Sequence, residues 1–379
     1  MGPLQGIRIV EFAGIGPGPF CGMLLADLGA EVVLVDRKGG SLPFNAQPKY
    51  DLTRRGKRSI AVDLKPPGAA EVVLRLIEKS DGLIEGFRPG VMERLGLGPD
   101  VCLARNPRLA YGRLTGWGQT GPLARAAGHD INYVALSGIL YHGGHAASAP
   151  AVPPTVVGDI VGGAMFMAVG ILSGILSARV TGRGQVIDTA ITDSCALMNT
   201  LVQGMRVQGL WSDRRQANAL DGAAHWYDCY QCADGGWISV GALEPQFYQL
   251  LLVKCGLTGQ GLEGAQFDLK RWPELKQRFA ELFRTKTRDE WCALLEGTDV
   301  CFAPVLSIAE AQQHPHNVAR GAYVEIDGVA HAAPAPKFSA TPAQVGSPPA
   351  GVGTQTRELL ELAGYGAAEV EELKASGIV

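Results

Sequence analysis

Short apolar runs and longer amphipathic segments alternate along the first 115 residues of the chain. The apolar runs have the length of buried strands and lie at residues 7–12, 31–36, 59–64, 82–85 and 109–114. Between them, residues 20–28 and 68–80 carry apolar side chains at helical spacing, and residues 89–105 form a turn-rich helical piece. Strands that alternate with helices predict a parallel sheet with right-handed crossovers. The expected fold class is therefore α/β, with a large Rossmann-like domain.

Residues 160–178 form an uncharged apolar run of about transmembrane length. A membrane span is one interpretation of this run, and a wholly buried helix of a large α/β domain is the other. Small side chains at Gly162, Gly163 and Ser173, and the lack of a second comparable run in the sequence, favour the buried helix. We therefore expect no membrane insertion.

The apolar rhythm breaks at residues 211–224, where charged and polar side chains predict a linker. The elements expected beyond residue 180 are strands at 182–188, 226–231 and 236–241, and helices at 192–210, 245–255, 272–284, 287–296, 307–313 and 354–363. From Pro334 the chain is rich in Pro, Gly, Ala and Ser, which is typical of a strap on a protein surface. The sequence thus predicts a large domain of residues 1–210, completed by about 331–379, and a smaller α+β domain of residues 225–330.

The amino-acid composition excludes some classes of binding partner for this protein. The chain has 379 residues, 46% of them hydrophobic and 19% charged, as in an ordinary soluble enzyme with room for two domains. A formal charge of -3 argues against a general nucleic-acid binder. Cys229 and Cys232 form a C-x-x-C, but no second pair stands at zinc-ribbon spacing, so we expect reduced thiols and no metal. The chain shows no signal peptide, and the cytoplasm is the expected compartment.

Basic side chains gather near the predicted strands. The group comprises Arg37, Arg54, Arg55, Lys57, Arg58, Arg88 and Arg94. Loops that leave the strands of an open α/β sheet bind ligands, and Arg and Lys in such loops suit phosphate groups. A solvated basic surface is the alternative for any one of these residues. Together they predict a site for a phosphate-rich ligand.

The glycine-rich turn at residues 14–19 also invites a dinucleotide-binding interpretation. The fingerprint G-x-G-x-x-G requires glycine or alanine where Pro19 stands, because the helix must pack closely on the strand. We therefore expect no nicotinamide cofactor.

Residues 128–133 bring a histidine, a carboxylate, an amide and a phenol together. His129 suits proton transfer because the pKa of histidine lies near neutrality. Asp159 precedes the apolar run, where burial would let it hold a proton and its backbone N–H would face an enolate oxygen. Two such groups on opposite faces of the carbon beside a thioester carbonyl would invert that carbon. A helix N-cap role for Asp159 and a structural role for His129 are the alternatives, and spacing does not choose between them.

Seven short motifs occur in order along nearly the whole chain. They are residues 14–19 (GIGPGP), 60–65 (IAVDLK), 85–90 (EGFRPG), 115–119 (TGWGQ), 128–133 (GHDINY), 157–159 (VGD) and 241–248 (GALEPQFY). Together they resemble the alpha-methylacyl-CoA racemases of the family III CoA-transferase superfamily. The resemblance implies an isomerase of lipid and fatty acid metabolism that interconverts (2R)- and (2S)-2-methylacyl-CoA thioesters by two-base 1,1-proton transfer. It implies no separate cofactor, since CoA is part of the substrate.

The resemblance also assigns residues. It implies that His129 and Asp159 are the catalytic acid/base pair, and that Glu244, on the smaller domain, approaches His129 and tunes it. The residues implied to hold CoA are Arg37, Val62, Asp63, Leu64, Lys65, Gly86, Phe87, Arg88, Arg94, Gly128, Asp130, Ile131, Asn132 and Tyr133. Members of the family form interlocked dimers, so a homodimer is implied as well.

Two other functions stay open. A family III CoA-transferase would use Asp159 as a nucleophile that forms an anhydride with the acyl group. His129 favours the racemase, because the transferase mechanism has no obvious need for an imidazole there. A non-catalytic CoA-binding scaffold would keep the basic loops but gives no reason for His129 and Asp159 together.

Overall fold

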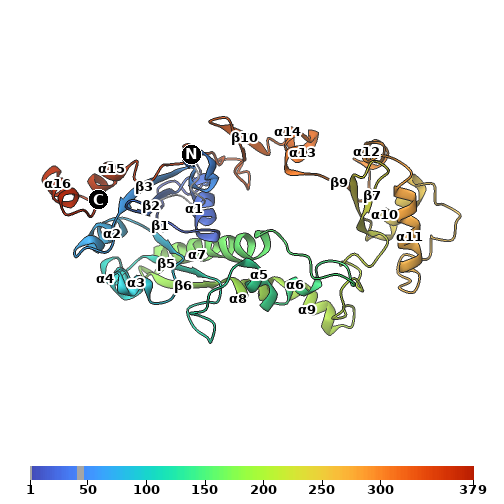
Figure 1. Cartoon of the computed structure of the whole chain (residues 1–379), viewed down its shortest axis with the longest axis horizontal. Helices are drawn as coiled ribbons and strands as arrows, with labels where there is room; N and C mark the ends of the chain where they lie inside the picture. The colour runs from blue at the N-terminus through green and yellow to red at the C-terminus, as the bar shows by residue number, and fades with distance from the viewer. Residues whose placement is uncertain (1, 41–46) are drawn as a thin grey trace. The chain divides into compact units, whose positions relative to one another are not determined.

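The structure is a computed structural model that describes residues 2–40 and 47–379 (Figure 1). The chain divides into two compact units. The first comprises Met1–Ser137, Pro153–Met198 and Val318–Val379, and the second comprises Gly138–Val152 and Asn199–Asn317. These bounds differ from the expected ones: residues 138–152 and 199–210 lie in the second unit, and residues 318–330 lie in the first. Residues 211–224 belong to the second unit instead of linking two domains. Trp211 packs edge-on against His142, and the Tyr141 hydroxyl donates to the Asp213 carbonyl, so this stretch is built into the unit.

The first unit contains a six-stranded parallel sheet in the order β3-β2-β1-β4-β5-β6. The strands are β1 (Arg8–Phe12), β2 (Glu31–Arg37), β3 (Lys57–Val62), β4 (Gly82–Glu85), β5 (Ala110–Thr115) and β6 (Gln185–Ala190). This order defines a Rossmann-like doubly wound sheet. The α/β prediction is confirmed, and the first five strands begin and end within two residues of their expected bounds.

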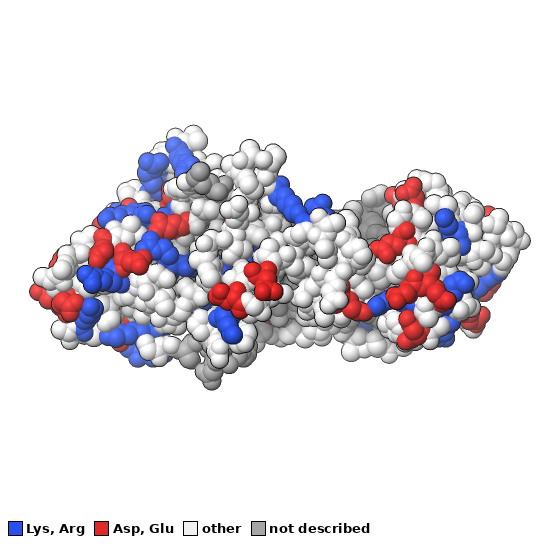
Figure 2. Space-filling view, turned by 90° about the horizontal axis from the view of Figure 1, so that it is seen from above, with Lys and Arg blue, Asp and Glu red and all other residues white. Residues whose placement is uncertain are grey.

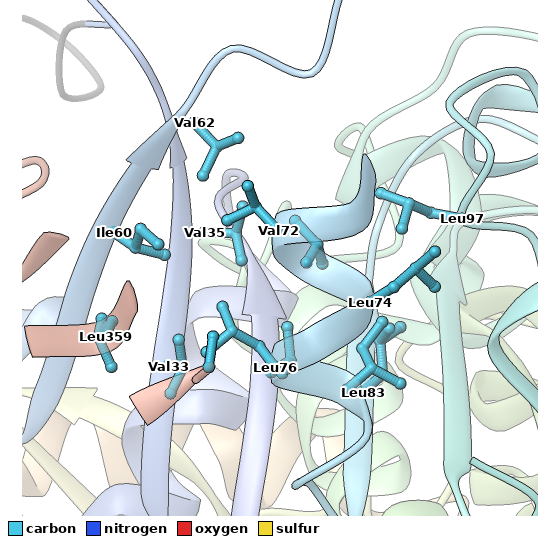
Figure 3. Close-up of a cluster of buried hydrophobic side chains, with 14 of the residues drawn as sticks. Val33, Val35, Ile60, Val62, Val72, Leu74, Leu76, Leu83, Leu97 and Leu359 are labelled. Carbon is cyan, nitrogen blue, oxygen red and sulfur yellow. The ribbon is translucent and has the colours of Figure 1, made fainter. Parts of the chain in front are cut away.

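Helices cover the sheet. They are α1 (Pro17–Asp27), α2 (Ala69–Ile77), α3 (Val91–Arg94), α4 (Pro99–Arg105), α5 (Asp130–Leu136), α7 (Phe166–Thr181) and α8 (Ile191–Met198), with short 3-10 turns at Pro48–Tyr50 and Leu52–Arg54. The C-terminal part adds a hairpin, β10 (Tyr323–Ile326) and β11 (Val329–Ala332), and helices α15 (Thr356–Leu362) and α16 (Ala367–Ala375). In the core, Val72 and Leu76 of α2 meet Val33 and Ile60 of the sheet, and Leu359 of α15 closes the cluster (Figure 3).

The long apolar run is not wholly buried, so that prediction is wrong. It forms a π-helical segment (Val156–Met165) that continues directly into α7. This stretch is long and apolar enough to cross a membrane by length and composition, and 44% of its most apolar window is buried. One face of α7 packs on β5 and β6 through Met167, Ile171 and Ile175. The opposite face exposes large apolar side chains, with Val180 87% exposed.

The second unit is α+β, as expected. Its antiparallel sheet consists of β7 (Tyr227–Gln231), β8 (Trp237–Gly241) and β9 (Phe302–Val305). Its helices are α6 (Ile139–His142), α9 (Thr200–Val207), α10 (Pro245–Lys254), α11 (Trp272–Phe283), α12 (Arg288–Leu295) and α13 (Ile308–Gln313), and α14 (Pro315–Ala319) lies where the chain leaves the unit. Aromatic side chains, among them Trp226, Tyr248 and Phe279, fill its core.

Candidate active site

A pocket of about 430 Å³ opens at the carboxyl edge of the six-stranded sheet. Its walls include residues at or after the ends of three neighbouring strands: 14–15 and 17–19 after β1, 86–89 after β4 and 115–117 at the end of β5. The strand order reverses between β1 and β4, and ligands of open α/β sheets bind at such a switch point. His129 and Asp159 both line this pocket.

Asp159 is half-buried in the first turn of the π-helical segment, whose N-cap is Thr155. The N-cap alternative for Asp159 is therefore wrong. Burial, and then the nearby charge of Asp130, raise the pKa of Asp159 to about 6, while His129 acts in the opposite direction. A carboxyl group with this pKa both holds and releases a proton near neutral pH.

The backbone N–H of Asp159 is not available to an enolate oxygen. It donates to the Oδ1 atom of buried Asp130 at 2.7 Å. The Asp130 carboxylate passes over Gly158, where a Cβ atom would lie 2.4 Å from Oδ1. The expectation that this N–H faces the substrate is therefore wrong, because the N–H already donates its hydrogen bond to Asp130.

His129 is exposed in the pocket and precedes α5 as its N-cap. Its backbone N–H donates to Asn132 Oδ1 at 3.0 Å. The Tyr133 hydroxyl donates to the Gly128 carbonyl, and the Tyr133 ring lies edge-on to Trp117 with 4.7 Å between centroids. These contacts hold residues 128–133 together, so the His129 imidazole is attached to a backbone that is fixed by hydrogen bonds and ring packing.

A buried network supports the loop after β4. Glu85 Oε2 accepts the backbone N–H of Phe87 at 2.7 Å, and Glu85 Oε1 accepts Arg113 Nε at 2.9 Å. Arg113 also pairs with Glu93 at 2.8 Å. This network fixes the backbone on which exposed Arg88 reaches the pocket.

The pocket brings together some of the predicted CoA residues: Gly86, Phe87, Arg88, Gly128 and Tyr133. The others fall outside the residues that line it. Arg37 and Val62 are paired at the carboxyl ends of β2 and β3, with residues 63–65 directly after them, and Arg94 ends α3. Asp130, Ile131 and Asn132 form the first turn of α5. Glu244 is an exposed residue of the second unit, and its approach to His129 stays a prediction.

Four members of the predicted basic cluster do not serve an anion site. Arg54 pairs with Asp36, Arg55 with Asp27 and Lys57 with Glu11, each at 2.6 Å and each buried, and Arg58 pairs with Glu31 and Glu358. These residues lie before or at the start of β3, and the side chains of Arg54 and Lys57 end in ion pairs with Asp36 of β2 and Glu11 of β1. On the face that Figure 2 presents, Lys and Arg likewise lie beside Asp and Glu. The prediction is wrong for these four because the sequence does not reveal their distant carboxylate partners.

The pocket also contains residues that the sequence did not single out for the site. Phe12, Trp117 and Ile191 line it. Trp117 belongs to the motif at residues 115–119, which was a usable signal. Phe12 and Ile191 look like ordinary core residues in the sequence.

The chain belongs to CoA-transferase family III, whose family model matches residues 4–356. It is 43% identical to the alpha-methylacyl-CoA racemase of Homo sapiens over 99% of this chain and 97% of that protein. It is 30% identical to the succinyl-CoA–L-malate CoA-transferase alpha subunit of Chloroflexus aurantiacus over 100% of this chain and 92% of the relative. The crystal structure of a CAIB/BAIF family protein from Brucella suis superposes with a TM-score of 0.82 at 26% identity, covering 96% of this chain and 99% of that one. The predicted resemblance is confirmed.

Replacing Asp130 with asparagine is expected to lower the pKa of Asp159. The change removes the like charge that raises this pKa, while the amide oxygen still accepts the Asp159 N–H. The acidic limb of the pH profile for proton abstraction by Asp159 is expected at about pH 6 in the native chain and should move to lower pH in the variant. Burial is the larger cause and remains, so the shift is partial. An unchanged or alkaline-shifted limb in kcat/KM would contradict this assignment.

Proposed function

We propose that this protein is an alpha-methylacyl-CoA racemase that interconverts the (2R) and (2S) forms of 2-methylacyl-CoA thioesters. One base removes the α-proton, and the C–H electron pair moves into an enolate whose negative charge rests on the thioester oxygen. The second group lies on the opposite face in its protonated form, and it then donates a proton to the same carbon. The reaction needs no oxidant, reductant or acceptor, because one proton leaves and one arrives.

The observation that carries this proposal is the pairing of His129 and Asp159 in one pocket. A two-base mechanism requires one group protonated while the other is not. The pKa of Asp159, raised to about 6 by burial and by Asp130, makes its carboxyl a credible partner for an imidazole. The 43% identity to the human racemase supports the same reaction.

Incubation of each enantiomer in heavy water tests the proposal. Deuterium is expected at C2 of the recovered thioester from both enantiomers, together with loss of optical purity. Absence of both exchange and inversion in the intact protein would overturn it.

A CoA-transferase is the second candidate, favoured by the 30% identity to the Chloroflexus enzyme. In that mechanism the Asp159 carboxylate attacks the thioester carbonyl, the C–S bond breaks and the CoA thiolate leaves, which yields an anhydride. The two functions are separated by supplying one acyl-CoA and no carboxylic acid acceptor. Turnover under this condition supports the racemase, whereas a strict need for the acceptor supports the transferase.

Replacing Arg88 with alanine is expected to weaken acyl-CoA binding about tenfold or more, the usual worth of a charged hydrogen bond to phosphate. The reason is that Arg88 is exposed at the pocket and is carried on the loop that Glu85 fixes. The measurement is KM, with Arg108→Ala as the matched control, because Arg108 is exposed just before the opposite end of β5. Equal KM values for the two variants would contradict the role of Arg88.

We also propose that the protein is a homodimer. The exposed face of α7 supports this, since Val169 and Leu176 are each 64% exposed and Val180 is 87% exposed. An apolar stripe of this kind on a regular helix is typical of an interface. Sedimentation equilibrium of the full chain tests the proposal, and a monomer at micromolar concentration would contradict it.

A further inference from the structure

The carboxyl group of Asp159 rests against a residue that has no side chain. A Cβ atom built on Gly16 would lie 2.8 Å from Asp159 Oδ2 and 3.5 Å from its Cγ. The first distance is shorter than a carbon–oxygen contact allows, so Oδ2 fills the space that a side chain would take. Gly16 has a φ of 78°, which glycine adopts at no steric cost.

Gly16 is held close to Asp159 by the packing of α1 on the π-helical segment. One π-helical turn beyond Asp159, a Cβ atom on Gly163 would lie 2.8 Å from the Cβ atom of Pro17. Glycines on both partners therefore let Asp159 lie against the backbone of Gly16, and Pro17 against the backbone of Gly163.

The same turn is anchored from the sheet. Lys57 Nζ, which is fully buried, donates to the Pro19 carbonyl at 2.8 Å and to Glu11 Oε1 at 2.8 Å. The start of α1 is thus tied to β1 and β3 by a buried side chain.

We infer that Gly16 is a positioning residue for the proposed catalytic Asp159. The absence of a side chain at position 16 leaves the space that Oδ2 occupies, and so determines which way the carboxyl faces in the pocket. A side chain there would push the carboxyl away from its present place. This inference deepens the proposed racemase function and rests on it only for its kinetic test.

The test is Gly16→Ala. A misplacement of about 1 Å is able to cost about 100-fold in rate, so racemisation should fall by roughly that factor. Exchange of the α-proton in heavy water should fall comparably from one enantiomer, the one whose proton Asp159 removes. Exchange from the other enantiomer, whose proton His129 removes, should change by less than about threefold, because an added Cβ atom at position 16 would lie within 4 Å of Asp159 but not of His129.

Gly6→Ala is the matched control. Gly6 has a φ of 85° and lies in the exposed turn before β1, and no heavy atom lies within 4 Å of the place that its Cβ atom would take. It also has a positive φ but lacks the contact, and its replacement should leave both exchange rates unchanged. A second comparison adds Gly16→Ala to Asp159→Asn, in which only His129-driven exchange remains. That remaining exchange should then change by less than about twofold, since residues that act through one another are not additive.

Three kinetic results would overturn the inference: equal losses from both enantiomers, a Gly16→Ala variant that matches Gly6→Ala, or a further large loss in the Asp159→Asn background. A crystal structure of the Gly16→Ala variant decides the placement without any activity. A displaced Asp159 carboxyl supports the inference, and an unmoved one overturns it. If the native protein shows no exchange at all, the racemase proposal fails, and the crystal structure still tests Gly16.

Discussion

Replacing His129 with alanine is expected to lower the rate of racemisation by about 1,000-fold or more, within the range that a positioned acid or base contributes. His129 lies in the pocket with Asp159, and a single base cannot both remove a proton from one face and return it to the other. Asp159 remains, so exchange in heavy water should persist from one enantiomer and vanish from the other. Chiral separation and mass measurement of the recovered thioester give both quantities.

Asp159→Asn should give the mirror-image result, with exchange retained only from the enantiomer that His129→Ala loses. His316→Ala serves as the control, because His316 is an exposed histidine of α14. If His129→Ala and Asp159→Asn both retained exchange from the same enantiomer, the two groups would not lie on opposite faces of the α-carbon. The two-base mechanism would then be wrong, although thioester binding would be unaffected.

The central strands of the sheet were predictable because most of their residues are buried. Residues 32–35 are a continuous run of Val and Leu, and residues 83–84 are Leu and Ile next to a turn, which is typical of buried parallel strands. Helix α5 was missed, since residues 130–136 mix polar and apolar side chains without a helical stripe. The π-helical geometry at 156–165 was also missed, because an apolar segment without polar positions carries no periodicity to distinguish it.

The site was predictable only in part. His129 and Asp159 are far apart in the chain, and the family motifs, not their spacing, associated them before the pocket was known. The basic run at 54–58 was wrongly predicted to bind an anion. Each of its ion pairs joins residues at least 18 positions apart, as in Arg54–Asp36, so the partners are not apparent in the sequence. A residue's charge is visible in a sequence, whereas its neutralising partner depends on the fold.

The proposed role of Gly16 was not predictable from the sequence. In the sequence it is one of three glycines in the turn at 14–19, and nothing distinguishes it from Gly14 or Gly18. In the structure only the Gly16 Cβ position meets the Asp159 carboxyl. Gly16 is distinguished by the position of the Asp159 carboxyl beside it, and this position is not visible in the sequence.

Replacing Lys57 with methionine is expected to lower the free energy of unfolding by about 3–5 kcal/mol, the usual cost of leaving one member of a buried ion pair alone. Lys57 and Glu11 are both fully buried and lie 2.6 Å apart. Glu11 also fills the space beside Gly22, where a Cβ atom would lie 1.7 Å from Oε2, so it has no room to turn toward water. Urea unfolding near pH 8 measures the change, and Arg357→Met, in the exposed pair with Glu361, should cost under about 1 kcal/mol.

The double variant Lys57→Met/Glu11→Gln should recover at least half of the loss, because it leaves no buried charge. Burial raises the pKa of Glu11 from 4.5 to about 7, against the opposing effect of Lys57. Between pH 4.5 and about 7, Glu11 is therefore more protonated in the native chain than in the unfolded chain. The free energy of unfolding falls as the pH rises through this range. The double variant should lack this dependence. A Lys57→Met loss no larger than that of Arg357→Met would show that the buried pair does not hold the α1 turn in place.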